Sequence, residues 1–104
     1  MSKNDNVVQE QELFQKINRE TAKISWKELQ PHYASGVLVY VEPSQDLVNV
    51  AVEFSKDNKP QVEAWLTAGI ICRVTEEQAE SWIQNNQDFW ASVIAPWILI
   101  QSVK

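Results

Sequence analysis

Hydrophobic and polar positions along this chain alternate with periods that predict helices and strands in turn. Over residues 9–24, the side chains of Leu13, Ile17, Thr21 and Ile24 recur at spacings of three and four residues. Such spacing places them on one stripe of a helix, with polar residues on the remaining surface. The pattern therefore predicts an amphipathic helix over residues 9–24.

A second helix is predicted directly after the first. Ser25 and Glu28 have the spacing of a capping box. In this motif the Ser hydroxyl accepts from a backbone N–H three residues on, and the Glu side chain reaches back. The helix is therefore expected to begin at Trp26. Gly36 is expected to end it, because glycine readily takes the left-handed conformation found after a helix.

Two later helices show equally clear boundaries. Pro60 suits the first position of a helix, because its fixed backbone angle matches the helix and its missing N–H is not needed there. Gly69 ends that helix in the same way as the earlier glycine. Thr75 and Gln78 form a second capping box and open the next helix.

Short runs of branched and aromatic residues predict the strands. Residues 37–41, 70–74 and 97–101 are apolar runs bounded by glycine, proline or polar residues. Their length and their content of branched side chains are typical of strands, and the five apolar residues 37–41 predict a strand covered on both faces. Residues 89–94 fit either a further strand or a short helix.

The hydrophobic pattern of residues 47–55 fits the period of a strand and also that of a helix. Alternation of Val48, Val50 and Val52 favours a strand paired with residues 37–41. Asp46 at the start of the segment is a good helix N-cap and favours a helix. The helix is preferred here by a small margin, and the strand remains the alternative.

Together these elements predict an α+β fold. Three to four strands build a small sheet, with residues 47–55 or 89–94 as the possible fourth, and three to five helices pack on it. A chain of 104 residues has the size of one domain. We expect a flexible N-terminus over residues 1–8 and a single globular domain over residues 9–104.

The charge balance excludes several classes of partner. The net charge is −5, and residues 37–104 hold nine acidic against four basic side chains. Nucleic-acid affinity comes largely from Lys and Arg neutralising phosphates, so a nucleic-acid partner is not expected. No segment approaches the 18 apolar residues of a membrane span. The N-terminus also lacks the apolar stretch of a secretory signal, so a cytoplasmic location is expected.

Residue types that carry chemistry are scarce. Cys72 and His32 are each the single copy of their kind, so the usual Cys and His metal clusters are not possible. Glycine occurs only at Gly36 and Gly69, which excludes glycine-rich phosphate loops. We therefore expect no cofactor and no metal, and an enzyme is less expected than a binding protein. Catalytic carboxylate pairs remain open, because they meet only in the fold.

The five tryptophans divide into two groups. Trp65 and Trp82 fall on the inner stripes of their helices and are expected in the core. Trp26 opens a helix, and Trp90 and Trp97 flank the break at Ala95-Pro96, so partial exposure is expected for these three. Exposed Trp is a common anchor of protein interfaces. The alternative is that the three rings cover the ends of the small sheet.

A row of basic residues accompanies the first helix. Lys16, Arg19, Lys23 and Lys27 recur at spacings of three and four, away from the apolar stripe. Such a row is often simply a solvated face. It could also bind an acidic partner, including the acidic body of a second copy. The possible partner-binding surface therefore comprises Trp26, Trp90 and Trp97 together with Lys16, Arg19 and Lys23.

Several segments taken together resemble a known protein family. They are Glu20–Gln30, Asp46–Ala51, Val62–Leu66 and Ala95–Gln101. In combination they are similar to the short bacterial proteins of the family called domain of unknown function 2288, over about Leu13 to Gln101. The resemblance implies a bacterial, intracellular, single-domain protein. It carries no catalytic residue over to this chain.

Composition and pattern thus predict a small non-enzymatic interaction or regulatory protein that self-associates. The expected partner is a protein, either a second copy or another chain. The alternative is a small-molecule binding protein or small enzyme with a Trp-lined pocket. Clustered indoles with a few carboxylates would suit a cationic or ring-containing ligand.

Overall fold

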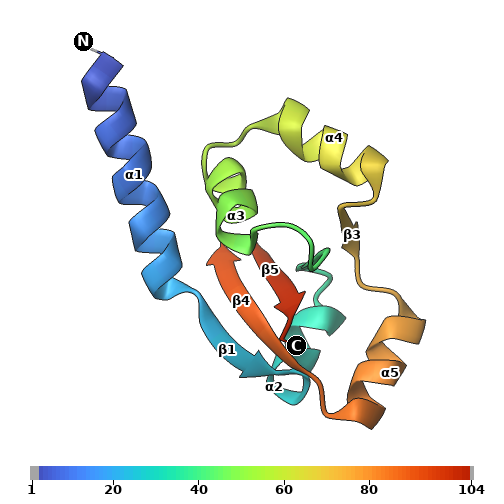
Figure 1. The fold of residues 1–104 in the computed structure, drawn as a ribbon. Helices are drawn as coiled ribbons and strands as arrows, with labels where there is room; N and C mark the ends of the chain where they lie inside the picture. Colours follow the sequence, from blue (N-terminus) through green and yellow to red (C-terminus); the bar gives the residue numbers. More distant parts are fainter. Residues whose placement is uncertain (1–2, 104) are drawn as a thin grey trace.

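One mixed β-sheet carries helices on both of its faces. The structure, a computed structural model, describes residues 3–103 (Figure 1). The elements follow the chain in the order α1 (Lys3–Glu20), β1 (Ala22–Ser25), α2 (Trp26–Ala34), β2 (Leu38–Val41), α3 (Leu47–Ser55), α4 (Lys59–Ala68), β3 (Ile71–Arg73), α5 (Glu76–Asn85), β4 (Asp88–Ile94) and β5 (Trp97–Ser102). The long helix α1 packs on the sheet near its C-terminal end, through Leu13 and Ile17, and its N-terminal end extends beyond the sheet (Figure 1).

The sheet has the strand order β1-β4-β5-β2-β3. β2 runs parallel to β5, and the other neighbouring pairs are antiparallel. β4 and β5 form a hairpin around the two residues Ala95 and Pro96, whose peptide bond is cis. The break predicted at these two residues is therefore the turn that places Trp97 at the start of β5.

Each face of the sheet has its own core cluster. Because side chains alternate along a strand, Val39, Val41 and Leu99 lie on one face, while Leu38 and Ile98 lie on the other. Helices α1, α3 and α4 cover the first face, which we call the α3 face. Helices α2 and α5 cover the second, which we call the α2 face.

The structure confirms the α+β class and most of the predicted elements. The three runs predicted as strands become β2, β3 and β5. The ambiguous segment 47–55 is helix α3, and Asp46 caps it by accepting from the backbone N–H of Val48 at 3.0 Å. The other open segment, 89–94, lies in strand β4. The sheet has five strands instead of three to four.

The first helix differs from its prediction at both ends. It begins at Lys3 and ends at Glu20, so the predicted extension to residue 24 was wrong. The Thr21 hydroxyl donates to the carbonyl of Ile17 at 2.7 Å and closes the helix. The chain then pairs with β4 as β1, which places Ile24 opposite Phe89. A partner 65 positions along the chain leaves no trace in the local pattern. The expected flexibility of residues 1–8 stays a prediction, and residues 1–2 lie outside the described range.

The helix boundaries follow the predicted signals closely. The capping box of α5 is complete, because Gln78 N–H donates to Thr75 Oγ1 at 3.1 Å and Thr75 N–H donates to Gln78 Oε1 at 3.0 Å. Of the two capping-box hydrogen bonds predicted for α2, the structure shows the one in which the Ser25 hydroxyl accepts from the Glu28 N–H, at 3.4 Å. Gly36 and Gly69 have φ of +75° and +76°, the left-handed conformation expected of them.

The complete capping box predicts a measurable contribution to stability. Replacing Thr75 with alanine removes the hydroxyl that satisfies the Gln78 N–H, so the free energy of unfolding should fall by about 1 kcal/mol. Urea denaturation followed by far-UV circular dichroism measures this loss. Thr75→Ser is the matched control, since it keeps the hydroxyl. Equal stability of the two variants would contradict the role assigned to this cap.

Candidate functional site

The structure sorts the five tryptophans into three buried and two accessible rings. Trp65 and Trp82 are buried, as predicted. Trp26 is only 2% exposed, so the prediction of an accessible ring there was wrong. As the first residue of α2 it points toward the sheet, where its ring lies 5.0 Å from Trp82 and 6.0 Å from Phe89. Trp90 is 42% exposed and Trp97 is half-buried.

Trp90 lies on the α3 face where the helices leave the sheet uncovered. Its direct neighbours across the strands are Lys23 of β1 and Gln101 of β5. The side-chain amide of Gln101 donates to the carbonyl of Gln45 at 2.7 Å and to that of Glu42 at 3.0 Å, which holds it beside the loop that precedes α3. A shallow hollow of about 310 Å³ adjoins the indole, lined by Asn18, Thr21, Asp46, Leu47, Val48, Trp90 and Gln101.

The predicted basic row is not continuous in the fold. Lys16 and Arg19 are exposed on α1, but Lys23 lies on β1 and Lys27 on α2. The row was wrong because the helix that would have carried it ends at Glu20. Of the predicted surface residues, the structure brings together Lys23 and Trp90. We call Lys23, Asp46, Trp90 and Gln101 the Trp90 surface.

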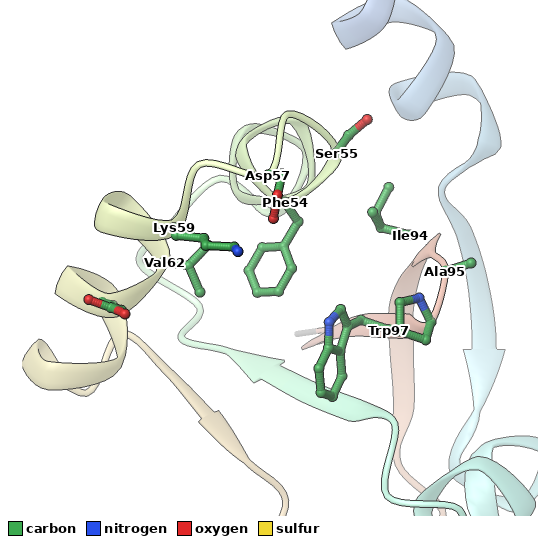
Figure 2. Close-up of a pocket in the computed structure, with 10 residues that line it drawn as sticks. Phe54, Ser55, Asp57, Lys59, Val62, Ile94, Ala95 and Trp97 are labelled. Atoms are coloured by element: carbon green, nitrogen blue, oxygen red, sulfur yellow. The ribbon is translucent and has the colours of Figure 1, made fainter.

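A larger hollow lies on the same face of the sheet, between α3, α4 and the β4–β5 turn. Figure 2 shows Phe54 of α3, Val62 of α4 and Trp97 of β5 lining one space. The volume of this groove is about 610 Å³. It is lined by Phe54, Ser55, Asp57, Lys59, Val62, Glu63, Ile94, Ala95, Pro96 and Trp97. An apolar hollow of about 180 Å³ borders Phe54, Val62 and Trp97 as well and runs on toward β3.

The indole of Trp97 is held by a contact from β3, the strand that lies beyond β2 in the sheet. The guanidinium carbon of Arg73 lies 4.7 Å from the centroid of the Trp97 ring. Arg73 Nη1 also donates to the carbonyl of Gly36 at 2.6 Å, which fixes the guanidinium in place. A cation over the face of an indole is attracted by the ring's quadrupole. The wall of the groove that Trp97 forms is therefore positioned before anything binds.

The charged residues near the groove divide into paired and unpaired groups. Lys56 Nζ lies 2.7 Å from Glu10 Oε1, and this contact raises the pKa of Lys56. Within residues 3–103, by contrast, Asp57 and Lys59 form no ion pair. In Figure 2 the Lys59 ammonium extends toward the space between Val62 and Phe54. Opposite charges are therefore available at the rim of an apolar groove.

The remaining reactive residue types lie apart from both surfaces or show no activation. His32 is exposed on α2, and Cys72 is half-buried on β3. Burial raises the pKa of the Cys72 thiol, which disfavours the nucleophilic thiolate. In the described part of the chain no three His, Cys, Asp or Glu side chains come together as a metal site. None of the helices described there has the length and apolarity to cross a membrane.

Sequence reasoning did not identify the groove. Its residues come from two stretches, 54–63 and 94–97, which only the fold brings together. The available signals were the polar break at Lys56-Asp57-Asn58-Lys59 and a Trp directly after Pro96. Neither one indicates a shared cavity without the sheet between them.

Comparisons with known proteins agree with this fold. The NMR solution structure of PA1075 from Pseudomonas aeruginosa is similar, with a TM-score of 0.78, 41% sequence identity, and coverage of 88% of this chain and 85% of that chain. No curated protein matches the chain. The family model described as protein of unknown function (DUF2288) matches residues 12–102, nearly the whole length. The chain therefore belongs to the DUF2288 family.

Proposed function

We propose that this protein is a non-enzymatic interaction protein of the cytoplasm that associates with a second copy of itself through the Trp90 surface. The observation that carries the proposal is a Trp side chain 42% exposed on an uncovered part of the sheet. Trp is the residue most enriched among side chains that dominate binding energy at interfaces. Covering it with a partner removes a large apolar area from water.

The charges around Trp90 favour a second copy as that partner. Lys23 lies on the β1 side of Trp90, where its exposed ammonium is 3.9 Å from Asp88 Oδ2, and Asp46 lies on the opposite side, beyond Gln101. In a two-fold symmetric contact, the same patch of both copies meets with its direction reversed. An axis through Trp90 then brings Lys23 of each copy opposite Asp46 of the other. In such a contact the opposite charges of the two copies face each other at the edges, and the two Trp90 rings meet at the centre.

The non-enzymatic part of the proposal rests on the scarcity of reactive groups. The chain has one His and one Cys, and neither lies on the Trp90 surface, since His32 is exposed on α2 and Cys72 lies on β3, where burial raises the pKa of its thiol. A general acid or base must reach the reacting atom within hydrogen-bond distance, which favours residues that converge in a cleft. The polar groups of the Trp90 surface instead lie on β1, on β5 and at the N-cap of α3, around a solvent-exposed indole.

Sedimentation equilibrium over a range of protein concentrations tests the proposal. The unaltered chain should form dimers, and Trp90→Ala should raise the dimer dissociation constant by roughly thirtyfold or more. Lys23→Glu should raise it by at least about tenfold, because both symmetric Lys23–Asp46 contacts become repulsive.

Matched controls separate these effects from a general loss of structure. Ile83→Ala removes an apolar side chain that is 53% exposed on α5, and Lys27→Glu makes the same charge reversal on α2. Both positions lie away from the Trp90 surface, so both variants should dimerise like the unaltered chain. A monomeric unaltered chain at every concentration would overturn the proposal, and so would dimers that tolerate Trp90→Ala.

A further inference from the structure

The groove between α3, α4 and the β4–β5 turn combines apolar walls with charged side chains of both signs, namely Asp57, Lys59 and Glu63. We propose that it binds a free amino acid with an aromatic or large apolar side chain. Its volume of about 610 Å³ lies within the range of small-molecule sites, roughly 300–1,000 Å³. This site is separate from the Trp90 surface, so the two proposals stand or fall independently.

The apolar part of the groove fits a flat or bulky side chain. Phe54 and Trp97 come from different elements and border the same space (Figure 2), and Val62 and Ile94 complete the apolar lining. Aromatic rings gain from offset or edge-to-face contact with another ring beyond the area they bury. Arg73 of β3 holds the Trp97 indole, so little ordering is required when a ligand binds.

The rim fits a zwitterion better than a ligand of single charge. Asp57 and Lys59 lie two residues apart in sequence, where α3 connects to α4, and both line the groove. The backbone between them is held, because Lys59 N–H donates to the Asp57 carbonyl at 2.9 Å. An ammonium can pair with the Asp57 carboxylate while a carboxylate pairs with the Lys59 ammonium. Glu63 lines the groove as well, so a ligand with a single charge would leave either Lys59 or the two carboxylates without a partner.

Three related probes test the recognition of each part by isothermal titration calorimetry. L-phenylalanine carries both charged groups, phenethylamine lacks the carboxylate, and 3-phenylpropionate lacks the ammonium. L-phenylalanine should bind the unaltered chain with a dissociation constant of about 0.1–1 mM, as expected for a ligand of its size in an open groove. Each of the two truncated probes should bind roughly fivefold more weakly.

Two variants assign the charges to their partners. Lys59→Gln should abolish the preference for L-phenylalanine over phenethylamine and keep the preference over 3-phenylpropionate. Asp57→Asn should abolish the preference for L-phenylalanine over 3-phenylpropionate and keep the preference over phenethylamine. Asn is a conservative replacement there, because Asp57 has φ of +55° and Asn tolerates this conformation well. Lys56→Gln is the control, since that lysine pairs with Glu10 and does not line the groove.

Several outcomes would overturn the proposal. The proposal fails if no probe gives a heat of binding at a probe concentration of about 10 mM, which is ten times the upper expected dissociation constant. Equal affinity for all three probes would show that the charges take no part. Binding that survives Trp97→Ala, in a variant whose circular dichroism spectrum is unchanged, would place the ligand elsewhere. Dimerisation measured in the same samples reports on the Trp90 surface, so failure of one proposal is distinguishable from failure of the other.

Discussion

Replacing Trp26 with alanine should lower the free energy of unfolding by about 3–5 kcal/mol. Trp26 is only 2% exposed, and its ring contacts the rings of Trp82, Phe89 and Tyr33 at centroid distances of 5.0, 6.0 and 5.7 Å. Alanine would leave a large cavity among these rings, and surrounding structure relaxes only partly around such a cavity. Urea denaturation followed by far-UV circular dichroism measures the loss.

Trp26→Phe is the informative comparison. The indole N–H of Trp26 is buried and has no hydrogen-bond partner among the described residues. A buried donor without a partner is unfavourable, so phenylalanine removes that unfavourable group while it keeps an aromatic ring in the cluster. We expect a loss of about 1–2 kcal/mol, smaller than that of the alanine variant. We assign the stabilising effect of Trp26 to its ring and not to its N–H. Equal losses of unfolding free energy for Trp26→Ala and Trp26→Phe would contradict this assignment.

Two consecutive residues of β4 should lose very different amounts of stability when each is replaced by alanine. Phe89 is fully buried on the α2 face, and its ring lies 4.7 Å from that of Trp82. Phe89→Ala should therefore lower the free energy of unfolding by about 3–5 kcal/mol. Trp90 lies on the α3 face and is 42% exposed. Trp90→Ala should lower it by about 1 kcal/mol, the scale of one cross-strand side-chain pair, and should instead weaken self-association.

Both variants are measured at the lowest protein concentration that gives a signal, because dimerisation adds to apparent stability by mass action. The denaturation midpoint then reports on the monomer, and sedimentation of the same samples reports on the dimer. A loss of stability from Trp90→Ala as large as that from Phe89→Ala would show that the Trp90 ring belongs to the core. The Trp90 surface could then not act as an interface.

Local signals were sufficient for the helix boundaries. The Thr75 and Gln78 spacing, the two glycines and Asp46 all act within four residues of the position they determine. Hydrogen bonds of this range are encoded in short stretches of sequence, which is why the caps were predicted correctly. The same range explains why Asp46 favoured a helix over residues 47–55 by only a small margin, since four Val and Leu side chains there also suit a strand.

Long-range pairing accounts for the predictions that failed. β1 exists because Ala22–Ser25 pairs with β4, and that partner also places the side chain of Trp26 in the interior. Neither effect can be inferred from the pattern around residue 24. The groove likewise depends on the β4–β5 turn reaching α3 and α4 across the sheet. The exposure of a Trp and the lining of a cavity depend on the assembled sheet, so they cannot be predicted from the periodicity of the sequence.

Fluorine NMR of protein labelled with 5-fluorotryptophan tests the central claim, that Trp90 is the ring covered by a second copy. The five resonances, one for each Trp, are assigned by single Trp→Phe variants. We predict that the Trp90 resonance shifts as protein concentration rises, while those of the buried Trp26, Trp65 and Trp82 stay in place. A Trp90 resonance that does not move with concentration would contradict the account.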